Sequence, residues 1–170
     1  MFLGAYSSAM GGTALCVFSP LPAALVEPLV EAAFRAEGLV RHADRTRDWY
    51  DAAGRPYAYY LEATDFEFGP EETAPLESAA GVEMACQVQV HIGVSDPAGR
   101  PALGRMAHRL AVEADGWVYI DLHDPPPAGI RELFERAGRC VAAADDDTVF
   151  FVDAAAMAAW LAHPEFYVIK

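Results

Sequence analysis

Apolar and polar positions alternate most clearly between Val82 and Ile92. The even-numbered side chains of this stretch are all apolar, whereas most of the odd-numbered ones are polar or charged. A period of two is typical of a strand that packs one face on a hydrophobic core and leaves the other face polar. Such a strand favours an antiparallel sheet, because the strands of parallel sheets are usually apolar on both faces.

A second stretch, from Leu103 to Ala114, has the spacing of a helix. Its later apolar residues fall 3, 4, 7, 8 and 11 positions after the first, and Gly116 follows as a stop signal. We expect this helix to cover the even-numbered side chains of the strand at residues 82–92. Similar spacing and capping signals predict three more helices: Val26–Phe34 before Gly38, Ile130–Ala137 before Gly138, and a last helix capped by Asp153 and ended by Pro164.

Short apolar runs rich in β-branched and aromatic residues predict the remaining strands. The region from Leu39 to Pro56 is interpreted as a strand or irregular stretch that leads into a hairpin. The acid-rich piece from Thr64 to Gly81 contains Pro70 and Pro75 and is interpreted as an exposed loop. The predicted strands are Thr13–Phe18, Tyr57–Ala63, Trp117–Leu122, Thr148–Val152 and Phe166–Ile169.

The order of these elements predicts an α+β fold with a mostly antiparallel sheet and helices packed on one face. From Thr13 to Leu122, with residues 39–56 left out, the order is that of a ferredoxin-like βαββαβ core. The remaining elements would form a C-terminal αβαβ extension of this core. We expect a single domain over residues 13–170, preceded by a loose lead over residues 1–12.

Charge is divided unevenly along the chain, whose formal net charge is −13. Residues 57–99 contain no Lys or Arg and carry eight acids, and residues 140–169 likewise carry five acids and no cation. Segregated charge produces a local field, whereas intermixed charge largely cancels within a Debye length of about 8 Å. The pattern therefore predicts a cationic partner.

The same acidic balance disfavours direct contact with nucleic acid or with anionic lipid, since the sequence pI is about 4.6. The first basic residue is Arg35, and no apolar run reaches the roughly 18 residues of a membrane span. Cys16, Cys86 and Cys140 match neither a disulfide framework nor a zinc pattern. We therefore expect a cytoplasmic protein without a signal peptide, with reduced and buried thiols.

Motifs that carry chemistry are missing from the sequence. There is no phosphate-binding glycine loop, and Ser95 stands in a strand end before an Asp-Pro turn rather than in a nucleophile elbow. The cluster Asp121–Asp124 has no partner ligands at metal-binding spacing, and Asp145–Asp147 lacks the spaced oxygens and glycine of a calcium loop. We expect no catalytic residue, no metal and no cofactor, and hence not an enzyme.

Three segments of the second half resemble a known group of proteins. They are the helix that contains Leu103-Gly104, the strand Gly116–Asp121 and the closing Trp160–Phe166. From about Val82 onward the chain is similar to small uncharacterised bacterial proteins of the polymorphic-toxin immunity type. The resemblance implies a cytoplasmic protein that binds and blocks a cognate toxin, with no catalytic residues to carry over.

Three classes of function remain open from the sequence. The first is a stoichiometric immunity-type protein that binds a basic toxin or another cationic protein. The second is a small enzyme or ligand-binding domain with a cleft near His91, His108 or His123. The third is a structural or assembly subunit. For the first class, the expected partner-binding residues are Asp65, Glu67, Glu71 and Glu72, with Asp145, Asp146 and Asp147 as a second patch.

Overall fold

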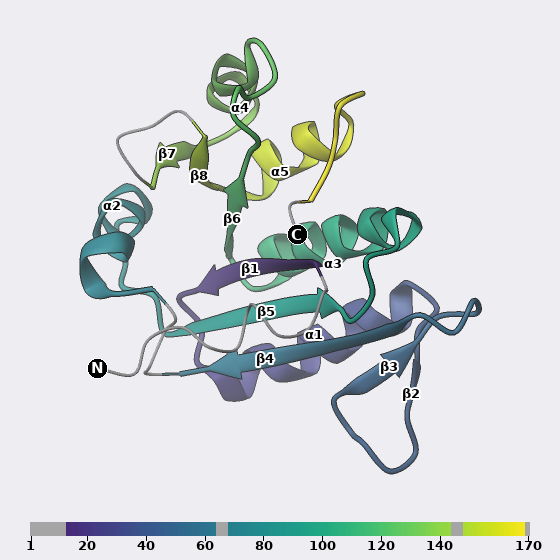
Figure 1. Ribbon diagram of the computed structural model, residues 1–170. Coiled ribbons are helices and arrows are strands. Elements are labelled where there is room, and N and C mark those ends of the chain that lie inside the picture. The colour runs from purple at the N-terminus through teal and green to yellow at the C-terminus, as the bar shows by residue number, and fades with distance from the viewer. Residues whose placement is uncertain (1–12, 64–67, 144–147, 169–170) are drawn as a thin grey trace, which may run out of the picture.

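The computed structural model describes residues 13–63, 68–143 and 148–168 (Figure 1). The predicted lead at residues 1–12 lies outside these ranges. The described helices are α1 (Ala23–Ala36), α2 (Pro70–Ala80), α3 (Arg100–Glu113), α4 (Ile130–Ala137) and α5 (Ala154–Leu161), with a 3-10 turn, η1 (Pro97–Gly99). The described strands are β1 (Thr13–Ser19), β2 (Val40–Arg41), β3 (Asp48–Tyr50), β4 (Pro56–Glu62), β5 (Cys86–Ile92), β6 (Trp117–Asp121), β7 (Cys140–Ala142) and β8 (Val149–Val152).

Within the described ranges these strands form one sheet in the order β2-β3-β4-β5-β1-β6-β8-β7, and every neighbouring pair is antiparallel. The central strands β4, β5, β1 and β6 are connected through α1 and α3 in the βαββαβ order of a ferredoxin-like unit. The predicted α+β class, antiparallel sheet and core are therefore confirmed.

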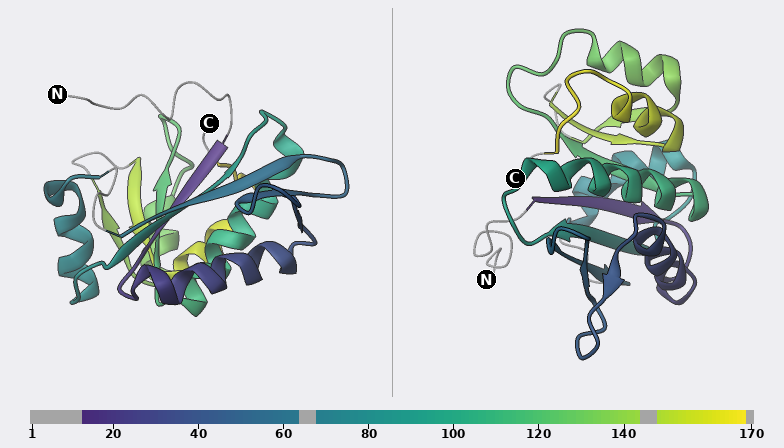
Figure 2. Two further views of the ribbon diagram at one scale, coloured as in Figure 1. Left: turned by 90° about the horizontal axis from the view of Figure 1, so that it is seen from below. Right: turned by 90° about the vertical axis from the view of Figure 1, so that its right-hand side faces the viewer.

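The main hydrophobic core lies between the sheet and four helices. Figure 2 shows α1, α3, α4 and α5 on the same side of the sheet. Val88 from β5 and Leu110 from α3 are both fully buried in this core, and so are the other even-numbered side chains of β5. The amphipathic strand and the amphipathic helix thus cover each other, as their spacing predicts.

The prediction that helices pack on one face alone is wrong, because α2 packs on the opposite face (Figure 2). Residues 70–80 were expected in a loop and instead form this helix. Its Leu76 is fully buried in a second core cluster with Phe18 and Trp117. The physical reason is that β1 is apolar on both faces, so its second face also needs a cover.

The predicted strand at residues 82–92 begins four residues later, at Cys86. Val82 is 46% exposed, and Met84 packs in the second cluster rather than under α3. The Met84 backbone N–H donates to the Glu77 carboxylate at 3.1 Å, so this segment connects α2 to the sheet. Only the part from Cys86 onward keeps the predicted pairing with the helical side.

The C-terminal extension differs from its prediction in its strands. The strand β8 and the helix α5 are confirmed, and Asp153 caps α5 by accepting from the Ala156 N–H at 3.0 Å. The predicted strand at residues 166–169 is not formed by its described residues 166–168. Phe166 instead packs edge-on against Trp160, with ring centroids 5.5 Å apart. The sheet gains β7, whose three half-buried residues gave no alternating pattern.

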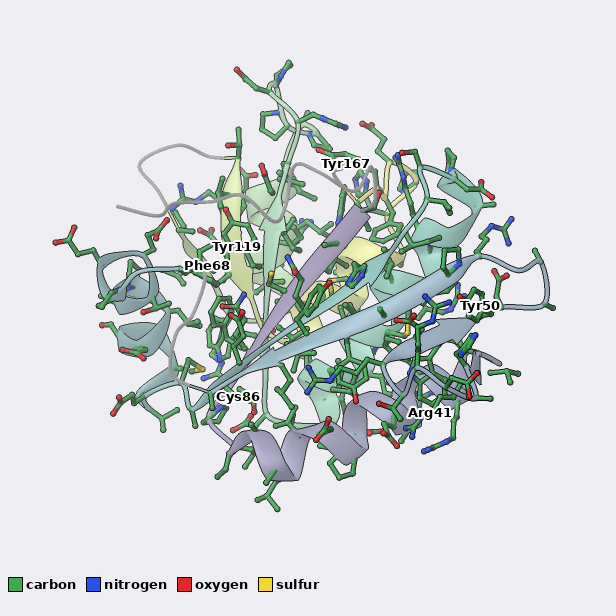
Figure 3. All side chains as sticks on the ribbon, turned by 60° about the horizontal axis from the view of Figure 1, so that its bottom comes forward. Arg41, Tyr50, Phe68, Cys86, Tyr119 and Tyr167 are labelled. Carbon is green, nitrogen blue, oxygen red and sulfur yellow. The ribbon has the colours of Figure 1, made fainter. Side chains whose placement is uncertain are left out.

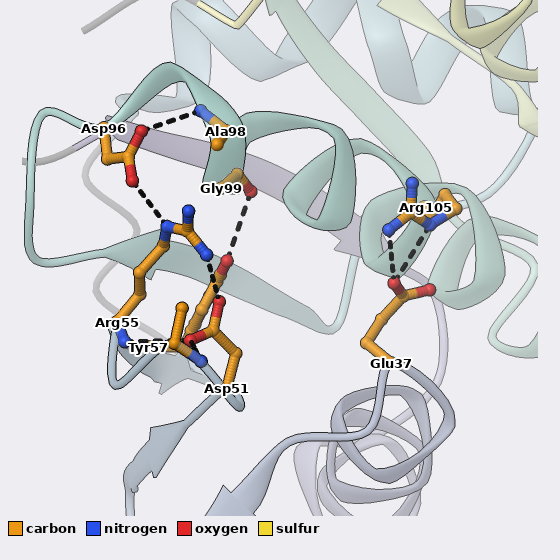
Figure 4. A network of polar contacts seen from close by, with 9 residues as sticks. Glu37, Asp51, Arg55, Tyr57, Asp96, Ala98, Gly99 and Arg105 are labelled. Atoms are coloured by element: carbon orange, nitrogen blue, oxygen red, sulfur yellow. Dashed lines mark hydrogen bonds and ion pairs between the residues drawn. The ribbon is translucent and has the colours of Figure 1, made fainter.

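A polar network fixes the turn before β4 to the start of α3 (Figure 4). The Arg55 guanidinium contacts an Asp96 oxygen at 2.6 Å and an Asp51 oxygen at 2.9 Å. Asp96 also accepts from the Ala98 N–H at 2.9 Å, and Arg105 pairs with Glu37 at 2.7 Å. These contacts join residues distant in sequence at the end of the sheet away from α2 (Figures 1 and 4).

Candidate functional site

The sheet face that carries α2 is here called the α2 face, and strand register determines which side chains share it. Tyr60 on β4 pairs with Gln89 on β5, which pairs with Cys16 on β1, which in turn pairs with Tyr119 on β6. Directly paired residues project to the same side of a sheet. This face therefore carries hydroxyl, amide and thiol groups in one row, in contrast to the apolar helical side.

A hollow on the α2 face lies at the junction of β4 and β5. It is lined by Tyr60, Glu62, Gln87 and Gln89, of which Glu62 and Gln87 are a direct cross-strand pair. Gln87 is only 2% exposed although it occupies a predicted polar position. Its amide nitrogen approaches the Cys16 sulfur at 3.6 Å, and its amide oxygen is buried without a hydrogen-bond partner among the described residues. Gln87 thus lines the hollow with a side chain whose amide oxygen is closed to solvent and has no hydrogen-bond partner among the described residues.

Beside the hollow, the Tyr60 ring stacks on the His91 imidazole, with centroids 5.0 Å apart and planes 10° from parallel. Burial lowers the pKa of His91, although Asp48 acts in the opposite direction. Tyr60 remains 47% exposed. The stack therefore holds an accessible aromatic side chain at the margin of the hollow.

The helix α2 closes one end of this face. Phe68, just before the helix, contacts Phe18 and Tyr119, with ring centroids 5.4 and 4.7 Å apart (Figure 3). Thr73 and Leu76 are the buried side chains of the helix itself. The other side of α2 is left to carry its acidic residues.

The two described members of the predicted partner-binding set lie on the first turn of α2. Glu71 and Glu72 are both exposed, but Glu72 also accepts from the Gly69 N–H at 2.7 Å and so caps the helix. The other predicted residues, Asp65, Glu67, Asp145, Asp146 and Asp147, lie outside the described residues. The hollow is not evident from the sequence, because Gln87 and Gln89 have the same polar signal as any solvated strand face.

The described carboxylates near α2 share a lack of ion-pair partners. Within the described ranges, none of them forms an ion pair with Lys or Arg; this set, here called the acidic end, comprises Glu62, Glu71, Glu72, Glu77 and Glu83. Glu62 and Glu83 flank the helix in sequence and are exposed. The described carboxylates of the acidic end therefore keep their charge without an ion-pair partner.

Arginines gather at the opposite end of the molecule, where Figure 3 labels Arg41 and Tyr50 far from Phe68. There Arg41 lies over the Trp49 ring, 4.8 Å from its centroid. Five arginines of this end have an acidic partner: Arg35 and Arg41 pair with Glu31, Arg45 with Asp48, Arg47 with Glu27, and Arg55 with Asp51 and Asp96. The charge segregation of the sequence is thus also a segregation in space.

The three candidate histidines do not share one place. His91 lies on the α2 face, whereas His108 lies on α3, which packs on the other side of the sheet. His123 follows β6 and stacks on Tyr167, whose hydroxyl accepts from the His123 N–H at 2.6 Å. His91 and His108 therefore lie on opposite sides of the sheet and cannot line one cleft.

Among the described residues, no group of three or more His, Cys, Asp or Glu side chains is arranged to hold a metal ion. Cys16, Cys86 and Cys140 form no disulfide with one another; Cys16 and Cys86 are buried, as expected, whereas Cys140 is half-buried. Within the described ranges no helix combines the length and the apolar character needed to cross a membrane.

No protein-family model, curated protein or solved structure matches the chain.

Proposed function

We propose that this protein is a stoichiometric binding protein whose acidic end docks a cationic partner protein. The observation that carries the proposal is the set of carboxylates around α2 that have no Lys or Arg partner among the described residues. Unpaired surface carboxylates keep their field, which steers a basic partner toward them and disfavours acidic ones. At the other end the arginines and carboxylates are intermixed and paired, so their fields largely cancel.

Within this class we propose an immunity-type inhibitor that neutralises a cognate bacterial toxin in the cytoplasm. The resemblance to immunity-type proteins that the sequence suggests from about Val82 onward is the reason for this narrower proposal. The net charge of −13 also suits a basic toxin that acts on nucleic acid, since an acidic inhibitor occludes the surface that such a toxin needs. The proposal assigns no catalytic residue, no cofactor and no membrane contact.

The experiment is a growth-rescue assay with the product of the neighbouring open reading frame. Expression of that product alone should arrest growth, and co-expression of this protein should restore it. Titration calorimetry of the purified pair should then give one-to-one binding. The His108→Ala and His123→Ala variants should protect as well as the wild type, because a binding protein does not depend on proton transfer.

The binding proposal would be rejected if the neighbouring product is toxic and well-folded protein neither binds it nor protects. Loss of protection in a histidine variant that still binds the toxin with unchanged affinity would instead favour an enzyme. Symmetric self-association without toxin binding, measured by light scattering, would favour the assembly subunit.

A further inference from the structure

The hollow between β4 and β5 has the chemistry of a receptor for a hydrogen-bond donor. Its buried Gln87 amide oxygen lacks a partner among the described residues, while the amide nitrogen of the same side chain is turned to Cys16. A buried acceptor without a donor is costly, so a group that donates to it is stabilised there. Directly opposite on β4 stands Glu62, whose carboxylate accepts but cannot donate when ionised.

We propose that this hollow binds the guanidinium group of an arginine side chain from the partner protein. The inference rests on the proposed binding function and identifies the group that enters the site. In the proposed complex Glu62 supplies the opposite charge, Gln89 offers its side-chain amide, and the accessible Tyr60 ring offers a stacking surface. The Gln87 amide oxygen is closed to solvent in the free protein, so its side chain must turn toward the hollow to accept a hydrogen bond from the ligand. Residues 57–99 contain no Lys or Arg that could satisfy the site from within the same stretch.

Geometry favours guanidinium over the other ligand classes. The side chains of a direct cross-strand pair start about 5 Å apart, so Glu62 and Gln87 present two separate acceptors to one ligand. A guanidinium has five N–H donors in a planar fork and stacks on aromatic rings, whereas an ammonium is a compact point charge. An anion would be repelled by Glu62, and an apolar group would leave the Gln87 oxygen without a donor.

The Tyr60 ring is suited to this role because it is already oriented. Its stacking on His91 at 5.0 Å restricts the ring, so less side-chain freedom is lost when a second planar group binds beside it. The chain itself uses the same contact elsewhere, with Arg139 over Trp117 at 4.8 Å.

The test is a titration of the isotope-labelled protein alone, followed by NMR, with N-acetyl-arginine amide as the probe. The side-chain amide signals of Gln87 and Gln89 and the ring signals of Tyr60 should shift and saturate. The uncharged isostere N-acetyl-citrulline amide should bind about tenfold more weakly, because charge-assisted hydrogen bonds are lost. The corresponding lysine amide should also bind more weakly than the arginine amide.

Two variants separate the hollow from the general acidity of this end. Glu62→Gln, at the exposed end of β4, should weaken arginine-amide binding about tenfold, and Glu71→Gln on α2 should leave it within about twofold. Retained amide spectra establish that each variant is folded. The site assignment is overturned if the probe does not shift the hollow residues, if citrulline binds equally well, or if both variants respond alike. Because no toxin is present, failure here is distinct from failure of the growth-rescue assay.

Discussion

At the residue scale, Arg55 connects two parts of the chain through charge-assisted hydrogen bonds. Its guanidinium contacts Asp51 in the preceding turn and Asp96 just before η1. The hydrogen bond from Arg55, followed by that from the Ala98 N–H, holds the pKa of Asp96 below its usual value. The pairing therefore makes the stability of this corner depend on pH.

Replacing Asp96 with Asn should lower the free energy of unfolding at pH 7 and also reduce its loss in acid. A carboxyl whose folded pKa is depressed stabilises the fold above its unfolded pKa of about 3.9, and this stabilisation disappears as pH falls through the folded pKa. The free energies of unfolding of wild type and variant, measured by urea unfolding between pH 7 and pH 2, should converge in acid. The exposed Asp44, which has no ion pair among the described residues, supplies the control Asp44→Asn. A constant difference between wild type and Asp96→Asn at every pH would contradict the linkage.

Single residues also mark the limit of what the sequence predicts about the site. The alternating pattern places Gln87 on a polar face, and it does lie on the face opposite Val88. Its burial, however, depends on Cys16 in a strand 71 positions away, a contact that no local pattern encodes. Glu72 was expected to bind a partner, but its carboxylate also caps the helix that was missed.

At the element scale, α2 determines the character of the candidate site and is the element that the sequence predicted least well. Only Thr73 and Leu76 of this helix are buried, so it has no apolar stripe at helical spacing. Pro75 inside the helix and Pro70 at its start are usual loop signals, although proline is well tolerated in a first helical turn. By contrast, α3 has six buried residues on one side, and its prediction from spacing was correct.

The capping contact distinguishes two adjacent acids on this helix. Glu72→Ala should lower the free energy of unfolding by about 0.5–1 kcal/mol, because the Gly69 N–H loses its acceptor. Glu71→Ala should change it by less than about 0.5 kcal/mol, because only the interaction of the carboxylate with the helix dipole is lost. Thermal unfolding measures both, and hydrogen exchange should show faster opening of α2 amides in the Glu72 variant. Equal effects of the two substitutions would argue against the cap.

At the scale of the whole molecule, the acidic and arginine-rich regions lie at opposite ends of the sheet, and helices lie on both of its faces. The arginine-rich hairpin β2–β3 lies at one end and α2 at the other, and α2 packs against β7 (Figure 1). The chain thus places its first acidic stretch beside the strand that precedes Asp145–Asp147 in sequence, although these three residues lie outside the described ranges. The element order predicted the core topology, because each predicted strand and helix of that unit had its own local signal, either a periodicity or a short apolar run. The position of α2 could not be predicted from its own sequence, because it depends on the need of β1 for apolar cover on its second face.

This polarity predicts how association with the proposed cationic partner should respond to salt. Neutralising Glu71 and Glu83 together as glutamines should lower the association rate about threefold at low salt and leave the dissociation rate nearly unchanged, because exposed charges act mainly on encounter. Stopped-flow measurements at increasing salt should bring variant and wild type together, since the Debye length falls from about 10 Å at 0.1 M to about 3 Å at 1 M. The matched control neutralises Asp44 and Glu132, two exposed acids outside the acidic end, and should change the rate less. Glu62 is left unchanged so that the proposed guanidinium site in the hollow between β4 and β5 is not altered at the same time. If both double variants slow association equally, net charge alone steers the partner and the acidic end has no special role.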